Sequence, residues 1–376
     1  MDYTCGDEMK PIDVLAQQID MVPEYLAQNG PKAISQAERF IPLKSDISHI
    51  LIGGCGDSHH AALGLELAFG TYSGHPTSAM EAMRLARYAP SLYGTEPETS
   101  LVIGISASGE VARTIEALEI WRELGAQTLA FTTNPESTLA SIAEHSLILS
   151  APDIAHGPGL LSYLGSLLLG YASLASMLEG TEESRLEDLI LQTPDQVYKW
   201  MGNEKIRAED YAHTSSDGIP VFLGSGSAHG SARFGAAKVM EAAGERCWAQ
   251  DVEEWAHLEY FCEPADMSTI LLSADGRSLS RELELVEAMT ALGRNVLISK
   301  WQGGKGWSAL EREILSPLAL WVAPSAYASA RAKILSEIPF RDFGGGRERK
   351  EGGGPSRIRS SQRLGLREMS HLKNER

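Results

Sequence analysis

Three groups of residues have the types and spacing to hold an anion and move a proton. The stretch GISASGE, residues 104 to 110, places small and hydroxyl side chains between an apolar run and a segment with helical periodicity. Lys238 and Glu241 are three apart in FGAAKVMEAAG and would share one helix face. His257 follows in DVEEWAHLEYF. A carboxylate base and a histidine that titrates near neutrality suit acid–base chemistry.

The GISASGE stretch has two readings. Free backbone N–H groups at a helix start can hold an anion, and serine hydroxyls donate hydrogen bonds without adding charge. Ser58, in the turn GGCGDS, would assist from the neighbouring loop. Alternatively, Ser108 only caps the following helix and Glu110 lies in its first turn.

Lys238, Glu241 and His257 also have plainer readings. A Lys and a Glu three residues apart on a helix most often form a surface ion pair. A single histidine among acids and aromatics is more often structural than catalytic.

The order of elements predicts an α/β fold built twice. HILIGGCGDSHHAALGLELAFG reads as strand, glycine-rich turn and helix, and LVIGISASGEVARTIEALEIWRELG repeats that order. IPVFLGSGSAHGSARFGAAKVME then repeats the first unit at an offset of 170, and STILLSADGRSLSRELELVEAMTALG repeats the second at 167. Proline 23 is expected to begin or kink a helix in residues 11 to 40.

The second copy differs where the first could bind an anion. Ser108 corresponds to Asp275, and Ser58 corresponds to Ala228. A carboxylate in the second cradle would oppose a phosphate, so we expect one phosphate site, in the first copy.

These motifs resemble the SIS (sugar isomerase) family, in particular the isomerase half of glucosamine-6-phosphate synthase and related amino-sugar-phosphate deaminases and deglycases. The resemblance covers roughly residues 45 to 340. Its Ser-Gln-Ser-Gly-Glu-Thr motif is similar to Ser106-Ala107-Ser108-Gly109-Glu110-Val111, followed by Thr114, and its Cys-Gly-Thr-Ser turn to Cys55-Gly56-Asp57-Ser58. The resemblance implies that Ser58, Ser106, Ala107, Ser108, Gly109 and Thr114 hold the phosphate of a sugar. Val111 replaces a threonine of the motif.

The resemblance also implies the fold and the catalytic residues. It implies two tandem SIS domains, each a flavodoxin-like parallel sheet sandwiched by helices. Glu241 falls on the catalytic glutamate, and His257 falls on a ring-opening histidine that the partner subunit contributes, which implies a homodimer. Lys238 would stabilise negative charge on the intermediate or pair with Glu241.

The expected activity is isomerisation or deamination of an amino-sugar 6-phosphate. Glu241 would move a proton between C1 and C2 through an enediol or enolamine, given burial that strengthens it as a base. No glutaminase domain and no tail lysine of the family pattern are recognised. The alternatives are a sugar-phosphate sensor without catalysis and an isomerase of unsubstituted hexose phosphates.

The domains are expected at 1–44 (helical), 45–180 and 195–340 (SIS), with a basic Gly-rich tail, 341–376, that is disordered or folds over the site. The formal charge of −17 argues against nucleic-acid binding.

Four scattered cysteines and no signal peptide favour the cytoplasm. The apolar run 160–178 is expected to be a buried helix and not a membrane span. No metal and no cofactor are expected, because Cys55, His59 and His60 have poor zinc spacing and the reaction needs no cofactor.

Overall fold

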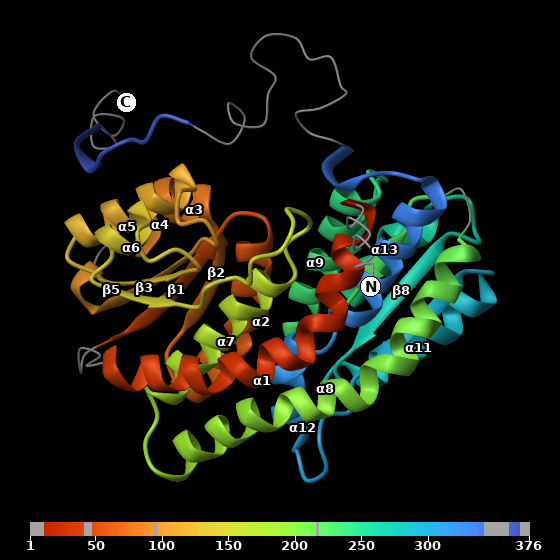
Figure 1. Ribbon diagram of the computed structural model, residues 1–376, viewed down its shortest axis with the longest axis horizontal. Coiled ribbons are helices and arrows are strands. Elements are labelled where there is room, and N and C mark those ends of the chain that lie inside the picture. The colour runs from red at the N-terminus through yellow and green to blue at the C-terminus, as the bar shows by residue number, and fades with distance from the viewer. Residues whose placement is uncertain (1–10, 41–46, 94–95, 216–217, 342–360, 369–376) are drawn as a thin grey trace, which may run out of the picture.

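Two parallel β-sheets, one in each half of the chain, organise the fold, with helices on both faces of each sheet (Figure 1). The computed structural model describes residues 11–40, 47–93, 96–215, 218–341 and 361–368. Parallel strands joined through helices are the architecture that the alternating sequence pattern predicts.

The first sheet has five strands in the order β2-β1-β3-β4-β5. Its strands are β1 (His49–Gly54), β2 (Thr77–Glu81), β3 (Ser100–Ile105), β4 (Gln127–Thr132) and β5 (His145–Ile148). Every residue of β3 and β4 is buried, as expected for parallel strands covered on both faces. The order 2-1-3-4-5 is that of flavodoxin-like sheets, which confirms the predicted fold class.

The second sheet repeats four of these strands in the order β7-β6-β8-β9. They are β6 (Val221–Leu223), β7 (Trp248–Gln250), β8 (Ser268–Ser273) and β9 (Asn295–Lys300). The equivalent turns have the same backbone conformation at their glycines, since Gly56 and Gly226 both have a φ of 57°. The duplication predicted from the sequence is therefore present in the structure.

Thirteen α-helices lie in the described residues. They are α1 (Val14–Phe40), α2 (Asp57–Tyr72), α3 (Ala82–Arg87), α4 (Ala89–Tyr93), α5 (Ala112–Glu123), α6 (Thr138–Ile142), α7 (Leu161–Ala175), α8 (Thr181–His213), α9 (Ser227–Ala242), α10 (Val252–Trp255), α11 (Leu279–Ala291), α12 (Ala309–Leu315) and α13 (Val322–Leu335). Proline 23 lies inside α1, so the expectation that it begins a helix is wrong.

The two halves meet where α2 crosses α9. A Cβ atom at Gly230 would lie 2.6 Å from the His60 carbonyl oxygen and 2.7 Å from the Gly64 nitrogen. Only glycine allows this backbone approach. The contact fixes the first helix of one repeat against the first helix of the other.

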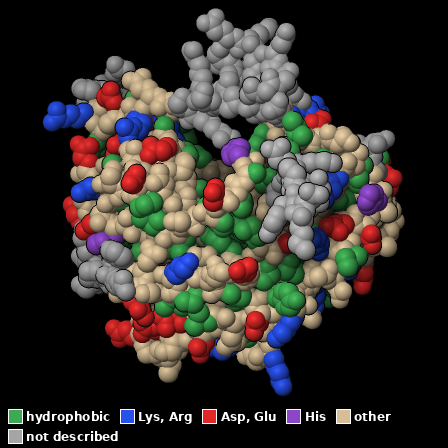
Figure 2. Space-filling model, viewed as in Figure 1, with side chains coloured by type: hydrophobic (Ala, Val, Ile, Leu, Met, Phe, Trp, Pro, Cys, Tyr) green, Lys and Arg blue, Asp and Glu red, His purple; other side chains and the backbone are tan. Residues whose placement is uncertain are grey.

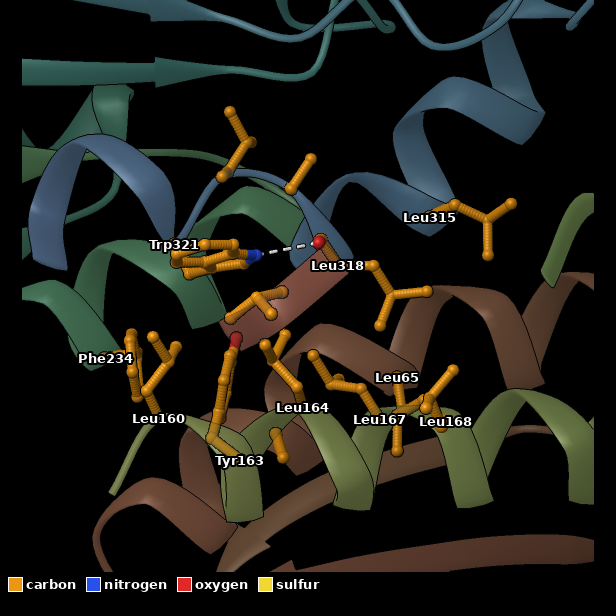
Figure 3. Packing of buried hydrophobic residues seen from close by; sticks show 14 of the residues in the cluster. Leu65, Leu160, Tyr163, Leu164, Leu167, Leu168, Phe234, Leu315, Leu318 and Trp321 are labelled. Carbon is orange, nitrogen blue, oxygen red and sulfur yellow. Dashed lines mark hydrogen bonds between the residues drawn. The ribbon is translucent and has the colours of Figure 1, made fainter. Parts of the chain in front are cut away.

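The apolar run that begins at Leu160 forms α7, a core helix. Fourteen of its fifteen residues are buried, and its leucines pack with Leu65, Phe234 and Leu318 from both halves (Figure 3). None of the helices in the described residues has the length and apolar character needed to span a bilayer.

Part of the C-terminal tail lies against α5. The Leu364 amide donates to the Glu116 carboxylate at 2.8 Å, and Arg363 pairs with Glu119 at 2.8 Å. Residues 361–368 thus contact the first half of the chain (Figure 1). The remainder of the predicted tail, apart from Arg341, lies outside the described residues.

Candidate functional site

The first candidate loop lies at the carboxyl ends of β1 and β3. These strands are neighbours, with Gly54 paired to Ile105 at their ends. The strand order reverses at this point, and ligands of open α/β sheets bind at such positions. Residues 55–58 and 106–111 therefore form adjacent turns at the edge where a ligand is expected.

Ser106 and Gly109 make this loop rigid. Ser106 is 1% exposed, and its hydroxyl accepts a hydrogen bond from the Gly109 amide at 3.1 Å. Gly109 has a φ of 68°, and a Cβ there would overlap Ser137 Oγ. The loop thus requires glycine at 109, and the Gly109 amide points into the loop.

Ala107 and Ser108 lie at the tip of the loop. The Ala107 carbonyl accepts hydrogen bonds from the hydroxyls of Thr132 and Thr133 at 3.1 and 2.8 Å, which ties the tip to the end of β4. The exposed Ser108 hydroxyl accepts from the Glu110 amide at 3.2 Å. Because α5 begins at Ala112 with Val111 as its N-cap, the alternative in which Ser108 caps this helix is wrong.

Glu110 belongs to the scaffold of the loop. Its carboxylate accepts hydrogen bonds from the Thr138 amide and hydroxyl at 2.7 and 2.8 Å. The bond from the Thr138 amide, followed by that from the hydroxyl, holds the pKa of Glu110 below its ordinary value. Its negative charge is thereby directed into α6 and not toward the loop tip.

Ser58 and Thr114 flank the loop from α2 and α5. Ser58 is half-buried in the first turn of α2, and Thr114 is fully buried. Burial raises the pKa of the neighbouring Cys55 thiol, against a smaller opposing effect of its contact with the Thr114 hydroxyl. The structure therefore brings Ser58, Ser106, Ala107, Ser108, Gly109 and Thr114 to one edge of the first sheet.

Lys238 and Glu241 form a buried ion pair that includes a third residue, Asp57. Lys238 Nζ lies 2.6 Å from Asp57 Oδ2 and also donates to Glu241 Oε2. Lys238 is 0% exposed, so the reading as a surface ion pair is wrong. Asp57 is the first residue of α2, beside Ser58, so Lys238 links Glu241 to the turn that carries Ser58.

The electrostatics of the cluster favour the charged forms of Lys238 and Asp57. Burial would lower the pKa of Lys238, but Asp57 and Glu241 outweigh burial and raise it above its ordinary value. Burial would likewise raise the pKa of Asp57, but Lys238 and then His60 hold it below its ordinary value. Lys238 is therefore protonated and Asp57 ionised across the neutral range.

His257 lies away from this cluster on the same chain. Its side chain is 68% exposed, and its Nε2 atom lies 3.2 Å from Glu253 Oε1 one helical turn earlier. Glu253 also pairs with Arg281, so charged groups adjoin His257, while the large apolar side chains of Trp248, Leu258, Tyr260 and Phe261, close to it in the sequence, are exposed.

The equivalent loop of the second half already contains carboxylates. Asp275 Oδ1 lies 2.7 Å from Lys300 Nζ, and its Oδ2 atom lies 3.5 Å from Arg312. A Cβ at Gly276 would lie 2.8 Å from the Glu313 side chain, whose carboxylate pairs with Arg277. The carboxylates of the second loop are thus paired with cations from Lys300, Arg312 and Arg277, and the expectation of a single phosphate site stays a prediction.

Sequence reasoning gave Asp57 no role of its own. It treated Asp57 as one position of the glycine-rich turn, although this charged residue stands where the family motif has a threonine. That departure was the available signal, but the partner of Asp57 lies 181 residues away in the chain.

The charge distribution on the visible face shows no single dominant patch. In Figure 2 the described Lys and Arg side chains are scattered among acidic ones. No group of three or more His, Cys, Asp or Glu side chains in the described residues is arranged to hold a metal ion.

Comparison with known proteins finds a known domain and several relatives. Residues 45–176 match the SIS domain model. Glutamine–fructose-6-phosphate aminotransferase [isomerizing] of Escherichia coli (strain K12) is 28% identical over 281 residues, which cover 73% of this chain and 44% of that protein. This chain therefore spans less than half the length of that relative.

Two solved structures have the same fold. The C-terminal domain of glucosamine-fructose-6-phosphate aminotransferase from Francisella tularensis superposes with a TM-score of 0.72 at 16% identity, covering 90% of this chain and 99% of that one. Glucosamine-6-phosphate deaminase from Thermotoga maritima gives 0.65 at 17% identity, covering 89% and 97%. These two likenesses show the fold, while the match at residues 45–176 shows a SIS domain in the first half of the chain, and the sequence as a whole is similar to that of the aminotransferase.

Proposed function

We propose that this protein is an enzyme that isomerises or deaminates an amino-sugar 6-phosphate. The observation that supports the proposal is the contact of Lys238 with both Glu241 and Asp57, because Asp57 precedes Ser58 in the turn next to the 106–109 loop. An anion site beside a carboxylate base is what proton transfer on a phosphorylated sugar requires. The names of the relatives, an isomerizing aminotransferase and a glucosamine-6-phosphate deaminase, support the same class of substrate.

In this mechanism the loop residues and Glu241 have separate tasks. Ser58, Ser108 and the backbone of the loop hold the phosphate and so fix the sugar relative to Glu241, whereas the fully buried Thr114 lies beneath the loop and does not meet the phosphate. Glu241, 30% exposed at its side chain, accepts the proton from C2 or C1 and returns it to the other carbon. Lys238, being fully buried, holds Glu241 and does not itself meet the sugar.

We further propose a homodimer in which His257 completes the site of the partner subunit. His257 is well exposed, and so are the apolar side chains of Trp248, Leu258, Tyr260 and Phe261 in the same part of the sequence, which association would bury. A histidine suits the opening of the sugar ring because it exchanges protons near neutral pH.

The test is an assay with glucosamine-6-phosphate, galactosamine-6-phosphate and a fructosamine-6-phosphate. Release of ammonia or amine and formation of ketose are followed for the wild type, Glu241→Gln and the surface control Glu287→Gln. We expect turnover by the wild type and the control, and a loss of at least about a hundredfold in Glu241→Gln. Full activity of Glu241→Gln would reject Glu241 as the base.

Mixing two inactive variants tests the dimer. If Glu241 and His257 of one site come from different subunits, a mixture of Glu241→Gln and His257→Asn reconstitutes about a quarter of the sites. No recovery after subunit exchange, with dimers present, would place both residues in one subunit.

A sensor without catalysis is the second candidate. Val111 stands where the family motif has a hydroxyl, and the Gly109 amide is used within the loop. Absence of turnover, together with a sugar-phosphate-dependent rise in melting temperature that Ser108→Asp removes, would favour the sensor.

A further inference from the structure

Lys238 is a completely buried cation shared by two carboxylates. Its ammonium donates to Asp57 Oδ2 at 2.6 Å and to Glu241 Oε2, and none of its surface reaches solvent. The side chains of Asp57 and Glu241 are 21% and 30% exposed. A molecule that enters from solvent therefore meets the carboxylates before the ammonium.

The arrangement is held firmly because it joins the two halves. Asp57 begins α2, whereas Lys238 and Glu241 lie on α9, and the backbones of these helices touch at Gly230. The Lys238 ammonium lies 4.9 Å from the centre of the Phe234 ring, which stacks on Tyr163 from α7 (Figure 3). Neither the ammonium nor Asp57 can move far without disturbing this core.

The number of carboxylates that share Lys238 affects how strongly Glu241 binds a proton. A lysine paired with a single glutamate stabilises the glutamate anion and weakens its affinity for a proton. A second carboxylate on the same lysine competes for the ammonium protons and adds a like charge close to the glutamate. Asp57 thereby restores part of the proton affinity that Lys238 removes from Glu241.

Other titratable groups near the cluster lie on three elements. His60 Nδ1 on α2 lies 3.6 Å from Asp57 Oδ1, and Tyr163 on α7 experiences the Asp57 charge. The next charged or titratable groups are His59 on α2 with His229 and Arg233 on α9, which interact with one another.

The positions related to these three residues by the repeat carry no equivalent charges. At the offset of 170, Asp57 corresponds to Ser227, Lys238 to Ala68 and Glu241 to Thr71. The three charged residues thus occur only in the copy of this arrangement that includes Ser58 of the candidate phosphate site. A role in function would explain why the related positions lack them.

We propose that Asp57 is a positioning residue for Glu241, which shares the buried Lys238 so that Glu241 is both held in place and kept basic enough to take a proton. The inference rests on the proposed function, in which Glu241 is the base. It assigns Asp57 to the speed and pH dependence of proton transfer and not to sugar-phosphate binding.

The test compares Asp57→Asn with Asp20→Asn. Asp20 is a matched control, because it also lies 2.6 Å from a lysine, Lys205, but on the surface between α1 and α8. With the best substrate of the assay above, we expect kcat of Asp57→Asn to fall at least about tenfold with KM nearly unchanged, and the acidic limb of kcat/KM to move to lower pH. Asp20→Asn should match the wild type.

A double variant separates charge from folding. In Asp57→Asn/Lys238→Met both the extra negative charge and the cation are removed, so the acidic limb should return toward its wild-type position. If Asp57→Asn alone does not fold, the double variant compared with Lys238→Met still measures the through-space effect of the Asp57 charge on Glu241, and an unchanged acidic limb there would reject the inference.

The outcomes distinguish the two proposals. An inactive wild type rejects the proposed function, and this inference with it. An active wild type whose acidic limb is unchanged in Asp57→Asn rejects this inference alone. A raised KM with unchanged kcat would make Asp57 a substrate contact and would also reject it.

Discussion

The two repeated loops start from the same strand-turn-helix plan and end with opposite charge character. In the first half, residues 106–109 present hydroxyl and backbone groups at the tip, and the nearest acid, Glu110, is engaged with Thr138. In the second half, Asp275 occupies the position of Ser108 and pairs with Lys300 and Arg312. One duplicated scaffold therefore carries one loop tip without a carboxylate and one whose carboxylate is paired with two cations.

The two loops also differ in which residue adopts the left-handed backbone conformation. In the first loop the residue in the left-handed region is Gly109, with a φ of 68°. In the second it is Asp275, one position earlier, with a φ of 52°. The paired cations around Asp275 offset the conformational preference of a residue with a Cβ, which the first loop avoids by using glycine.

The largest difference between the loops should appear on adding a methyl group. Gly109→Ala must fit a Cβ that overlaps Ser137 Oγ in a left-handed backbone, whereas Gly276→Ala meets the Glu313 side chain at 2.8 Å. We expect a loss of about 4 kcal/mol in unfolding free energy for Gly109→Ala, from strain and overpacking together. Urea denaturation should show a clearly smaller loss for Gly276→Ala, and equal losses would contradict the comparison.

Moving the carboxylate from the second loop to the first should abolish ligand binding. Ser108→Asp places a negative charge at the tip of the candidate phosphate site, so glucosamine-6-phosphate should bind at least about a hundredfold more weakly, or about 3 kcal/mol. Calorimetric titration measures this, with Ser184→Asp on exposed α8 as a control of equal charge. Unchanged affinity in Ser108→Asp would place the phosphate elsewhere.

The equivalent histidines His59 and His229 should make both halves sensitive to acid. Burial lowers the pKa of His59 to about 4 and also lowers that of His229. Because an unfolded histidine titrates near 6.5, their stabilisation is complete above that pH and is lost as pH falls toward 4.

For His59 the loss should reach about 2 kcal/mol at pH 4.5. His59→Gln should therefore lose less stability than the wild type between pH 7 and 4.5 in urea denaturation. A variant with the same pH slope as the wild type would show that His59 is protonated in the folded protein.

The smallest expected effects are those of removing one serine hydroxyl from each loop, and they distinguish a role in stability from a role in ligand binding. Ser106→Ala removes the acceptor of the Gly109 amide, and Ser273→Ala removes a donor to the buried Glu282 carboxylate at 2.5 Å. Each should lower the unfolding free energy by about 1.5 kcal/mol. Only Ser106→Ala should weaken glucosamine-6-phosphate binding, and weakening by both would remove the distinction between the loops.

The fold could be predicted from the sequence because its two signals, the strand-turn-helix patterns and the repeat, depend on residue types at nearby or regularly spaced positions. Strand-turn-helix units follow from apolar runs and glycine turns, and the offset of 170 relates Gly56 to Gly226 through residue types alone. The first residue of α5 was harder to predict, because its N-cap is Val111 and not Ser108. Helix ends depend on which hydrogen bonds compete, and here Ser108 bonds to the Glu110 amide within the loop.

The candidate site was predictable in its parts and not in its assembly. The sequence by itself determined the duplicated α/β architecture, the hydroxyl-rich loop at 106–109 and the carboxylate that replaces it at Asp275. Only the tertiary structure decided that Asp57 and Lys238 meet, that the lysine is fully buried and that His257 faces outward. The physical reason is distance along the chain, because contacts between repeats depend on how α2 packs on α9 and leave no periodic or local mark in the sequence.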